Sequence, residues 1–130
     1  MPLCYLIDSA QHCIFVHLSG AIDDWELGTK AQRLWAEPAY VPHFARLIHA
    51  SDTLEWRAGT SLMRAIASDV RTSGPTRVAM VARHEPVLTE FTQYAESLAG
   101  LPARVFPALD EAIAWLGVRL PEPWPPHGHT

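Results

Sequence analysis

The residues best suited to chemistry stand where an apolar segment ends, in the stretch LIHASDTLEWRAGTS (residues 47–61). Nucleophilic catalysis needs a serine, a histidine base and an acid that orients the base, and His49, Ser51 and Asp52 are of these types. On an extended chain, however, Ser51 and His49 point the same way, while Asp52 points to the opposite face. No glycine-rich turn follows to present a nucleophile. We therefore expect no catalytic residue here, and we expect Asp52 to cap a helix, with Glu55 completing a capping box.

A second polar loop follows the apolar segment RVAMVA (residues 77–82). Short apolar runs of this kind are typical of buried parallel strands. Ligand sites in parallel sheets gather beyond the carboxyl ends of the strands, so the loops of two adjacent strands form one neighbourhood. The candidate cleft for a ligand or a partner therefore consists of His49, Ser51, Asp52, Arg83 and His84.

Seven histidines raise the question of a metal site. His12 and His17 are five residues apart on one expected strand, so they project to opposite faces. His43 and His49 are six residues apart, which is about 20 Å along an extended chain. No pair has the spacing of a metal motif such as HExxH. We expect no metal site and no cofactor, although the two histidines of the tail could capture a metal from solution.

The composition is that of an ordinary globular protein. The chain has 130 residues, of which 48% are hydrophobic and 18% are charged, enough for one domain with its own core. A formal net charge of −4 without a basic cluster argues against a nucleic-acid partner. The apolar runs are far shorter than the ~20 residues that span a bilayer. The segment MPLCYLID lacks the features of a secretory signal, so we expect a cytoplasmic protein without stable membrane insertion and with reduced cysteines.

Periodicity and turn residues predict nine elements in the order ββαβαβαβα. The expected strands cover residues 3–7, 12–18, 44–50, 77–82 and 103–106, and the expected helices cover residues 24–37, 54–71, 86–100 and 109–117. A turn centred on Ser9 and Ala10 would place Cys4 opposite residue 15 and Cys13 opposite residue 6. Gly20 is expected to end the second strand.

Helices that alternate with strands after an opening hairpin predict a mixed, mostly parallel α/β sheet. We expect five strands in the order 1-2-3-4-5, with strand 1 antiparallel. Right-handed crossovers that always step in one direction put the helices mainly on one face. Residues 1–118 are predicted to form the single domain, and residues 119–130 a proline-rich, extended tail.

Four segments resemble the SpoIIAA-like proteins, which are related to STAS domains and share their fold with the CRAL-TRIO lipid-transfer domain. They are IFVHLSGAIDDWEL, EPAYVPHFARLIHASD, RVAMVARHEP and RVFPALDEAIAWLG, and they follow the order and spacing of that family. The resemblance covers residues 3–117. It implies a β/α superhelix with helices on one side.

The resemblance also points to a candidate phosphorylation site. In the bacterial anti-sigma-factor antagonists of this family, a serine at the start of the second helix is phosphorylated within an Asp-Ser-Ser-Gly-like sequence. The corresponding stretch here is RAGTSL, in which Thr60 and Ser61 stand nearest. The acidic residue and the following glycine are missing. We therefore expect that phosphorylation is not the switch of this chain.

Two functions remain open at this point. The first is a non-catalytic binding or regulatory module of the SpoIIAA-like or STAS type, acting through contact with an unidentified protein or through a small apolar ligand. The alternative is a small hydrolase-type enzyme that uses the neighbourhood of His49, Ser51 and His84. The absence of a convincing catalytic set favours the first.

The predicted strands are apolar on both faces, although helices are expected mainly on one. In the second strand Ile14, Val16 and Leu18 face one way, and Phe15 faces the other. A large apolar face seldom stays exposed on a monomer. We expect that the tail, with Trp124 as its anchor, packs on a protein surface, or that a homodimer covers the open face, and both can hold.

Overall fold

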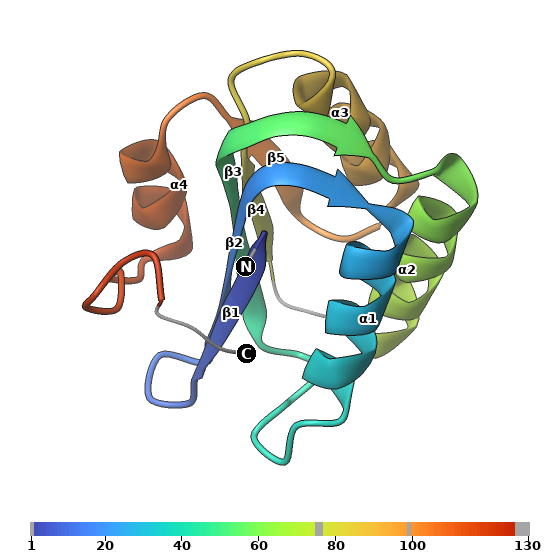
Figure 1. Cartoon of the computed structure of the whole chain (residues 1–130). Coiled ribbons are helices and arrows are strands. Elements are labelled where there is room, and N and C mark those ends of the chain that lie inside the picture. Colours follow the sequence, from blue (N-terminus) through green and yellow to red (C-terminus); the bar gives the residue numbers. More distant parts are fainter. Residues whose placement is uncertain (1, 75–76, 99, 127–130) are drawn as a thin grey trace.

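In a computed structural model of the chain, five strands form one sheet in the order β1-β2-β3-β4-β5 (Figure 1). The structure describes residues 2–74, 77–98 and 100–126. The strands are β1 (Leu3–Asp8), β2 (Cys13–Asp23), β3 (Ala45–Arg57), β4 (Val78–Val81) and β5 (Ala103–Phe106). The helices are α1 (Asp24–Trp35), α2 (Thr60–Ser73), α3 (Val87–Ser97) and α4 (Leu109–Leu116). β1 is antiparallel to β2 and the other neighbours are parallel, so the predicted fold class is confirmed.

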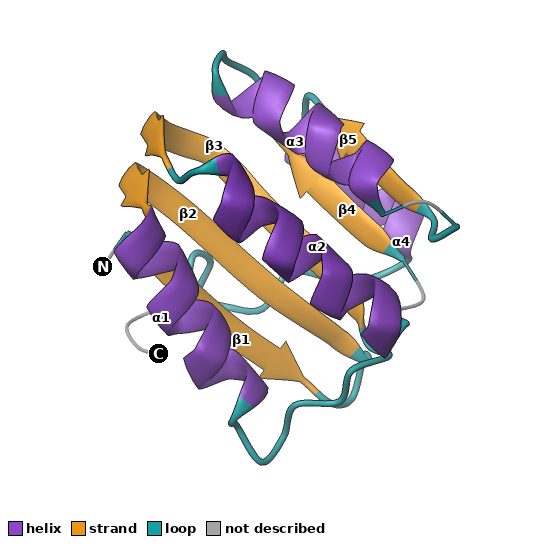
Figure 2. Cartoon of the chain, turned by 90° about the vertical axis from the view of Figure 1, so that its right-hand side faces the viewer, coloured by secondary structure: helices purple, strands orange, loops and turns teal. Residues whose placement is uncertain are grey.

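Three helices cover one face of the sheet, and the fourth lies on the other. Figure 2 shows α1, α2 and α3 side by side in front of the strands, with α4 behind them. The larger core cluster joins residues of the sheet, such as Leu18 and Met80, to residues of these three helices, such as Leu34, Val70 and Phe91. A smaller cluster with Phe15 and Leu47 lies on the side of α4. The expectation of helices mainly on one face is confirmed. No helix in the described part of the chain is long and apolar enough to cross a membrane.

The opening hairpin has a longer turn than the sequence predicts. Cys4 lies opposite His17 and Cys13 lies opposite Asp8, so the predicted register is wrong by two residues. The turn begins with Asp8, whose carboxylate accepts hydrogen bonds from the backbone and the side chain of Gln11 at 3.1 and 2.8 Å. This Asx-type interaction favours the longer turn. Both cysteines are buried, and neither forms a disulfide bond.

β2 and β3 are longer than predicted and remain paired to their ends. β2 continues to Asp23 and β3 to Arg57. Two register irregularities, on either side of Ser19 and Gly20, each place one extra residue in β3. Gly20 does not end its strand, as we had expected. It adopts a left-handed conformation with φ 66°, which glycine takes at little cost, at the second irregularity.

The longer β3 displaces the second helix. The periodicity predicted this helix over residues 54–71, but α2 begins at Thr60 and follows Gly59, which makes no side-chain cap. The predicted capping box is wrong, because Asp52 and Glu55 both lie within β3. Pairing with β2 satisfies the backbone N–H and C=O groups of this segment, and this tertiary contact outweighs the local helical pattern.

The tail lies on the sheet face that α4 leaves open. Its start is held by Gln11, whose Oε1 accepts from the Arg119 backbone N at 2.7 Å and whose Nε2 donates to the Arg119 carbonyl at 2.8 Å. Trp124 packs edge-on against Phe15, with 6.0 Å between the ring centroids. The expectation that Trp124 anchors the tail on a protein surface is therefore confirmed. His127 and His129, the tail histidines considered for metal capture, lie outside the described residues.

We expect Trp124→Ala to lower the free energy of unfolding by about 2 kcal/mol, because a half-buried indole loses its packing against Phe15. Trp25→Ala is the matched control, since the side chain of Trp25 is 71% exposed, and it should change stability by less than about 0.5 kcal/mol. Urea denaturation of both variants measures the difference. Equal, small effects would show that the tail does not contribute to the core in solution.

Candidate functional site

Four side chains meet beside the end of β4, on the face of the sheet that carries α4 and the tail, which we call the tail face. His17 of β2 is paired with His49 of β3, and their ring centroids are 5.3 Å apart. His17 Nε2 lies 3.0 Å from Oδ2 of Asp52. The indole Nε1 of Trp124 donates to Nδ1 of His49 at 3.2 Å, and the two rings are stacked. We call His17, His49, Asp52 and Trp124 the histidine cluster.

A bulge in β3 brings Asp52 into this cluster. Ser19 shares a face with His17 because the two are two residues apart on β2. The partner of Ser19 is Asp52, which is three residues beyond His49, the partner of His17. The extra residue therefore returns Asp52 to the face of both histidines. The prediction that Asp52 points away from His49 is wrong for this reason.

The hydrogen bond from Trp124 defines the protonation state of His49. A ring nitrogen that accepts a hydrogen bond carries no proton, so Nδ1 is bare and the proton of the neutral ring is on Nε2. Burial lowers the pKa of His49 below its ordinary value of 6.5, and the neighbouring His17 lowers this pKa further, whereas Asp52 raises it. The tail is therefore held by a neutral imidazole.

Two imidazoles and a carboxylate could in principle bind a metal ion. In the histidine cluster, however, Nε2 of His17 faces Asp52, and Nδ1 of His49 accepts from Trp124. Across the described ranges, no group of three His, Cys, Asp or Glu residues is placed to hold a metal ion. The cluster functions as a contact between the sheet and the tail.

The other members of the predicted cleft do not join this cluster. Ser51 is half-buried, and within the described residues no hydrogen bond joins its hydroxyl to His49 or His84. Arg83 and His84 are exposed in the loop after β4. Sequence reasoning thus found His49 and Asp52 but missed the partners that they contact. The predicted pairing of the second and third strands was the one available signal for His17.

The candidate phosphoacceptors lie at the start of α2. Thr60 is its first residue and Ser61 its second, and both are exposed. The resemblance therefore assigned them to the correct end of this helix, although the helix begins later than predicted. The first turn of α2 contains no acidic residue. That phosphorylation is not the switch of this chain stays a prediction.

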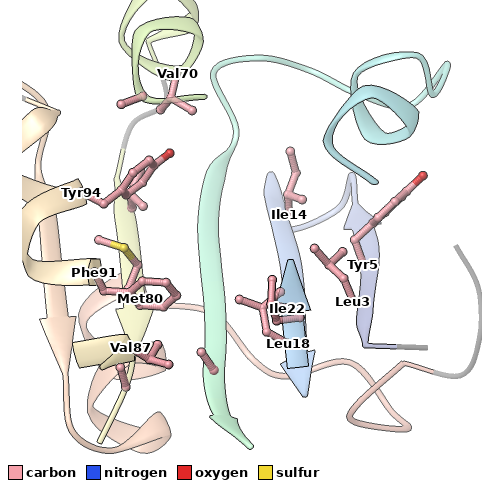
Figure 3. Close-up of a cluster of buried hydrophobic side chains, with 14 of the residues drawn as sticks. Leu3, Tyr5, Ile14, Leu18, Ile22, Val70, Met80, Val87, Phe91 and Tyr94 are labelled. Atoms are coloured by element: carbon pink, nitrogen blue, oxygen red, sulfur yellow. The ribbon is translucent and has the colours of Figure 1, made fainter. Parts of the chain in front are cut away.

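On the other face, a cavity of about 110 Å³ lies between the sheet and α1, α2 and α3. Its walls come from β1 to β4 and from these three helices. Several of its apolar lining residues are labelled in Figure 3: Leu3, Tyr5, Ile14, Leu18, Val70, Met80, Phe91 and Tyr94. Protein interiors are normally packed as densely as organic crystals, with few voids larger than a water molecule. A pocket of this size, partly open to the surface and walled by residues of the main core, is a candidate ligand site.

Lys30, Arg46 and Trp56 are among the lining residues of this apolar wall that carry polar atoms. Lys30 is buried but satisfied, because its Nζ donates to the Leu3 carbonyl at 3.0 Å and to Glu26 Oε2 at 3.1 Å. Nε of Arg46 and Nε1 of Trp56 are buried and have no hydrogen-bond partner in the described structure. Sequence reasoning missed Lys30 and Arg46 as lining residues. Arg46 gave a signal, as a charged residue within the apolar segment FARLIHA.

Comparison with a solved structure supports the fold. The chain is similar to an uncharacterized protein from the DUF3478 family, with a SpoIIAA-like fold, from Shewanella loihica PV-4. The TM-score is 0.54 at 17% sequence identity, and the match covers 88% of this chain and 93% of that chain. No protein-family model matches the sequence, and no curated protein does. The SpoIIAA-like fold is thus shared.

We expect the contact between the tail and the sheet to weaken as the pH falls. Because the pKa of His49 is lower in the folded chain than its ordinary 6.5, the unfolded chain binds more protons at this site below about pH 6.5. The stability from this site is complete above that pH and is lost as the pH falls toward the folded pKa.

The variant His49→Asn keeps an acceptor for Trp124 but cannot gain a proton. Urea denaturation between about pH 8 and about pH 5 should therefore show a steeper loss of stability for the natural chain than for the variant. The NMR signal of the Trp124 indole N–H should shift over the same range. Parallel pH profiles for the two proteins would contradict the assignment.

Proposed function

We propose that this chain is a non-catalytic binding module that holds a small apolar ligand between its sheet and α1, α2 and α3. The observation that carries the proposal is the cavity of about 110 Å³ within the larger core. Apolar cavities stay dry and accept apolar solutes, and a cavity of ~150 Å³ is large enough for benzene. A ligand of about five or six heavy atoms matches the smaller volume here.

The arrangement of the tail face supports binding over hydrolysis. The hydrolase alternative requires Ser51 to reach a histidine base. In the histidine cluster, His17 faces Asp52, and the Nδ1 of His49 accepts from Trp124. Neither of these two ring nitrogens is directed at a serine. No observation favours the hydrolase, so the binding module is the better-supported function.

A protein partner remains a proposal beside the ligand. The fold neighbour supports a STAS-type module but carries no information on a partner. The sheet face that we expected a homodimer to cover carries α4 and the described part of the tail, including Trp124. A homodimer, if formed, would therefore use another surface or displace the tail. A cytoplasmic location also stays a proposal.

We expect 1-pentanol to bind in the cavity and to shift the methyl NMR signals of Ile14 and Ile66, which line it. Ala31→Leu replaces a methyl group on the cavity wall with an isobutyl group, which should fill much of the void. This variant should bind the alcohol at least tenfold more weakly, because the space is occupied.

Ala114→Leu is the matched control, since Ala114 is exposed on α4, on the far side of the sheet. It should bind 1-pentanol as the natural chain does. If saturating alcohol leaves the methyl signals of Ile14 and Ile66 unchanged in the natural chain, the cavity is not a ligand site. Equal binding by Ala31→Leu would place the alcohol elsewhere.

A further inference from the structure

The cavity of about 110 Å³ is lined by Arg46, a buried cation without a carboxylate counter-ion, and this feature defines a ligand class. We propose that the cavity selects a short aliphatic monocarboxylate, with its carboxylate on the guanidinium of Arg46 and its alkyl chain along the apolar wall. The inference rests on the proposed binding function. It adds the charge and the chemical class of the ligand.

Arg46 is held in place but is incompletely bonded. It is the second residue of β3, lies opposite Ile14 and Val78, and is only 6% exposed. Its Nη2 donates to the Tyr40 hydroxyl at 2.7 Å and to the Pro42 carbonyl at 3.2 Å. Its Nε has no acceptor in the described structure, although it is buried. A buried N–H group of this kind normally has a protein, water or ligand partner.

The guanidinium of Arg46 lies over the ring of Tyr40, 5.6 Å from its centroid, but no carboxylate of the described residues pairs with its charge. Its two hydrogen-bond acceptors are neutral oxygens, and the ion pairs formed by the described residues do not include it. Lys30 provides an internal comparison, because it lines the same cavity and is equally buried, yet it pairs with Glu26 at 3.1 Å. Burying an unpaired charge is costly, so buried charges are usually paired. An anionic ligand would supply at Arg46 what Glu26 supplies at Lys30.

The surroundings of Arg46 favour a monoanion. A single guanidinium balances one negative charge, whereas a phosphate dianion would leave a net charge in an apolar core. The planar guanidinium donates to carboxylate oxygens in a defined geometry. Tyr94 also lines the cavity, and burial raises the pKa of Tyr94 to about 12, so its phenol stays neutral beside Arg46 and does not compete for its charge.

The size of the cavity limits the alkyl chain. Its volume of about 110 Å³ is smaller than the ~150 Å³ that accommodates benzene. A monocarboxylate of about four or five carbons fits this volume, because its carbon chain contributes only four or five heavy atoms and its carboxylate oxygens lie against Arg46, whereas a long-chain fatty acid does not fit. Pentanoate is therefore a suitable probe, and 1-pentanol is its uncharged counterpart of nearly the same shape.

The test compares pentanoate and 1-pentanol in titrations of the full chain near pH 7.5, where the carboxylate is ionised. We expect pentanoate to bind at least tenfold more tightly and to shift the NMR signal of the Arg46 Nε–H group. Equal binding, or tighter binding of the alcohol, would overturn the inference and leave the proposed function intact. If neither compound binds, the proposed function fails as well.

Two variants test which arginine causes the preference for pentanoate over 1-pentanol. Arg46→Met removes the charge but keeps an apolar side chain of similar length, so it should bind 1-pentanol and lose the preference for pentanoate. Arg83→Met is the control, since Arg83 is exposed in the predicted cleft after β4, and it should keep the preference. Loss of the preference in Arg83→Met alone would place the carboxylate in that cleft and overturn the inference. If Arg46→Met does not fold, the natural chain alone decides whether Arg46 binds the carboxylate. The two measurements are its relative affinity for pentanoate and 1-pentanol and the shift of its Arg46 Nε–H signal.

Discussion

The rest of the structure depends on a sheet whose inner strands are apolar on both faces. All four residues of β4, Val78–Val81, are buried, and they alternate between the two core clusters. Such a strand needs cover on each side. α1, α2 and α3 supply it on one face. α4 contacts β3, β4 and β5 on the other, so the face of β2 with Phe15 and His17 is left to the tail and Trp124.

The order of the helices and strands could be predicted because it follows from local patterns in the sequence. Apolar runs, helical spacing and turn residues identify nine segments, and the rules of chain connection then define the sheet. The length of β3 could not be predicted in this way. Residues 54–57 were predicted to begin a helix, and only pairing with the far end of β2 makes them a strand. The face of Asp52 depends in turn on a bulge, which shifts Asp52 and Thr53 by one position against β2 before the second irregularity adds another.

The candidate site was harder to predict than the fold, because its walls come from seven elements. No short motif links Arg46 of β3 with Tyr94 of α3 or with Lys30 of α1. The two buried cations differ only in their neighbours. Glu26 stands one helical turn before Lys30 and pairs with it, whereas Arg46 finds the neutral oxygens of Tyr40 and Pro42. On the face of the sheet that the tail covers, the polar groups bond to one another instead. His17 contacts Asp52, and Trp124 donates to His49 and so attaches the tail to the sheet.

The central claim is that the core between the sheet and α1, α2 and α3 contains a space that takes up a ligand. A crystal structure of the full chain under xenon pressure tests it most directly, because xenon enters apolar cavities without requiring a polar contact. The account predicts xenon between Ile48, Met63 and Met80, three residues that line the cavity. A core without xenon at this position, with these side chains packed against one another, would contradict it.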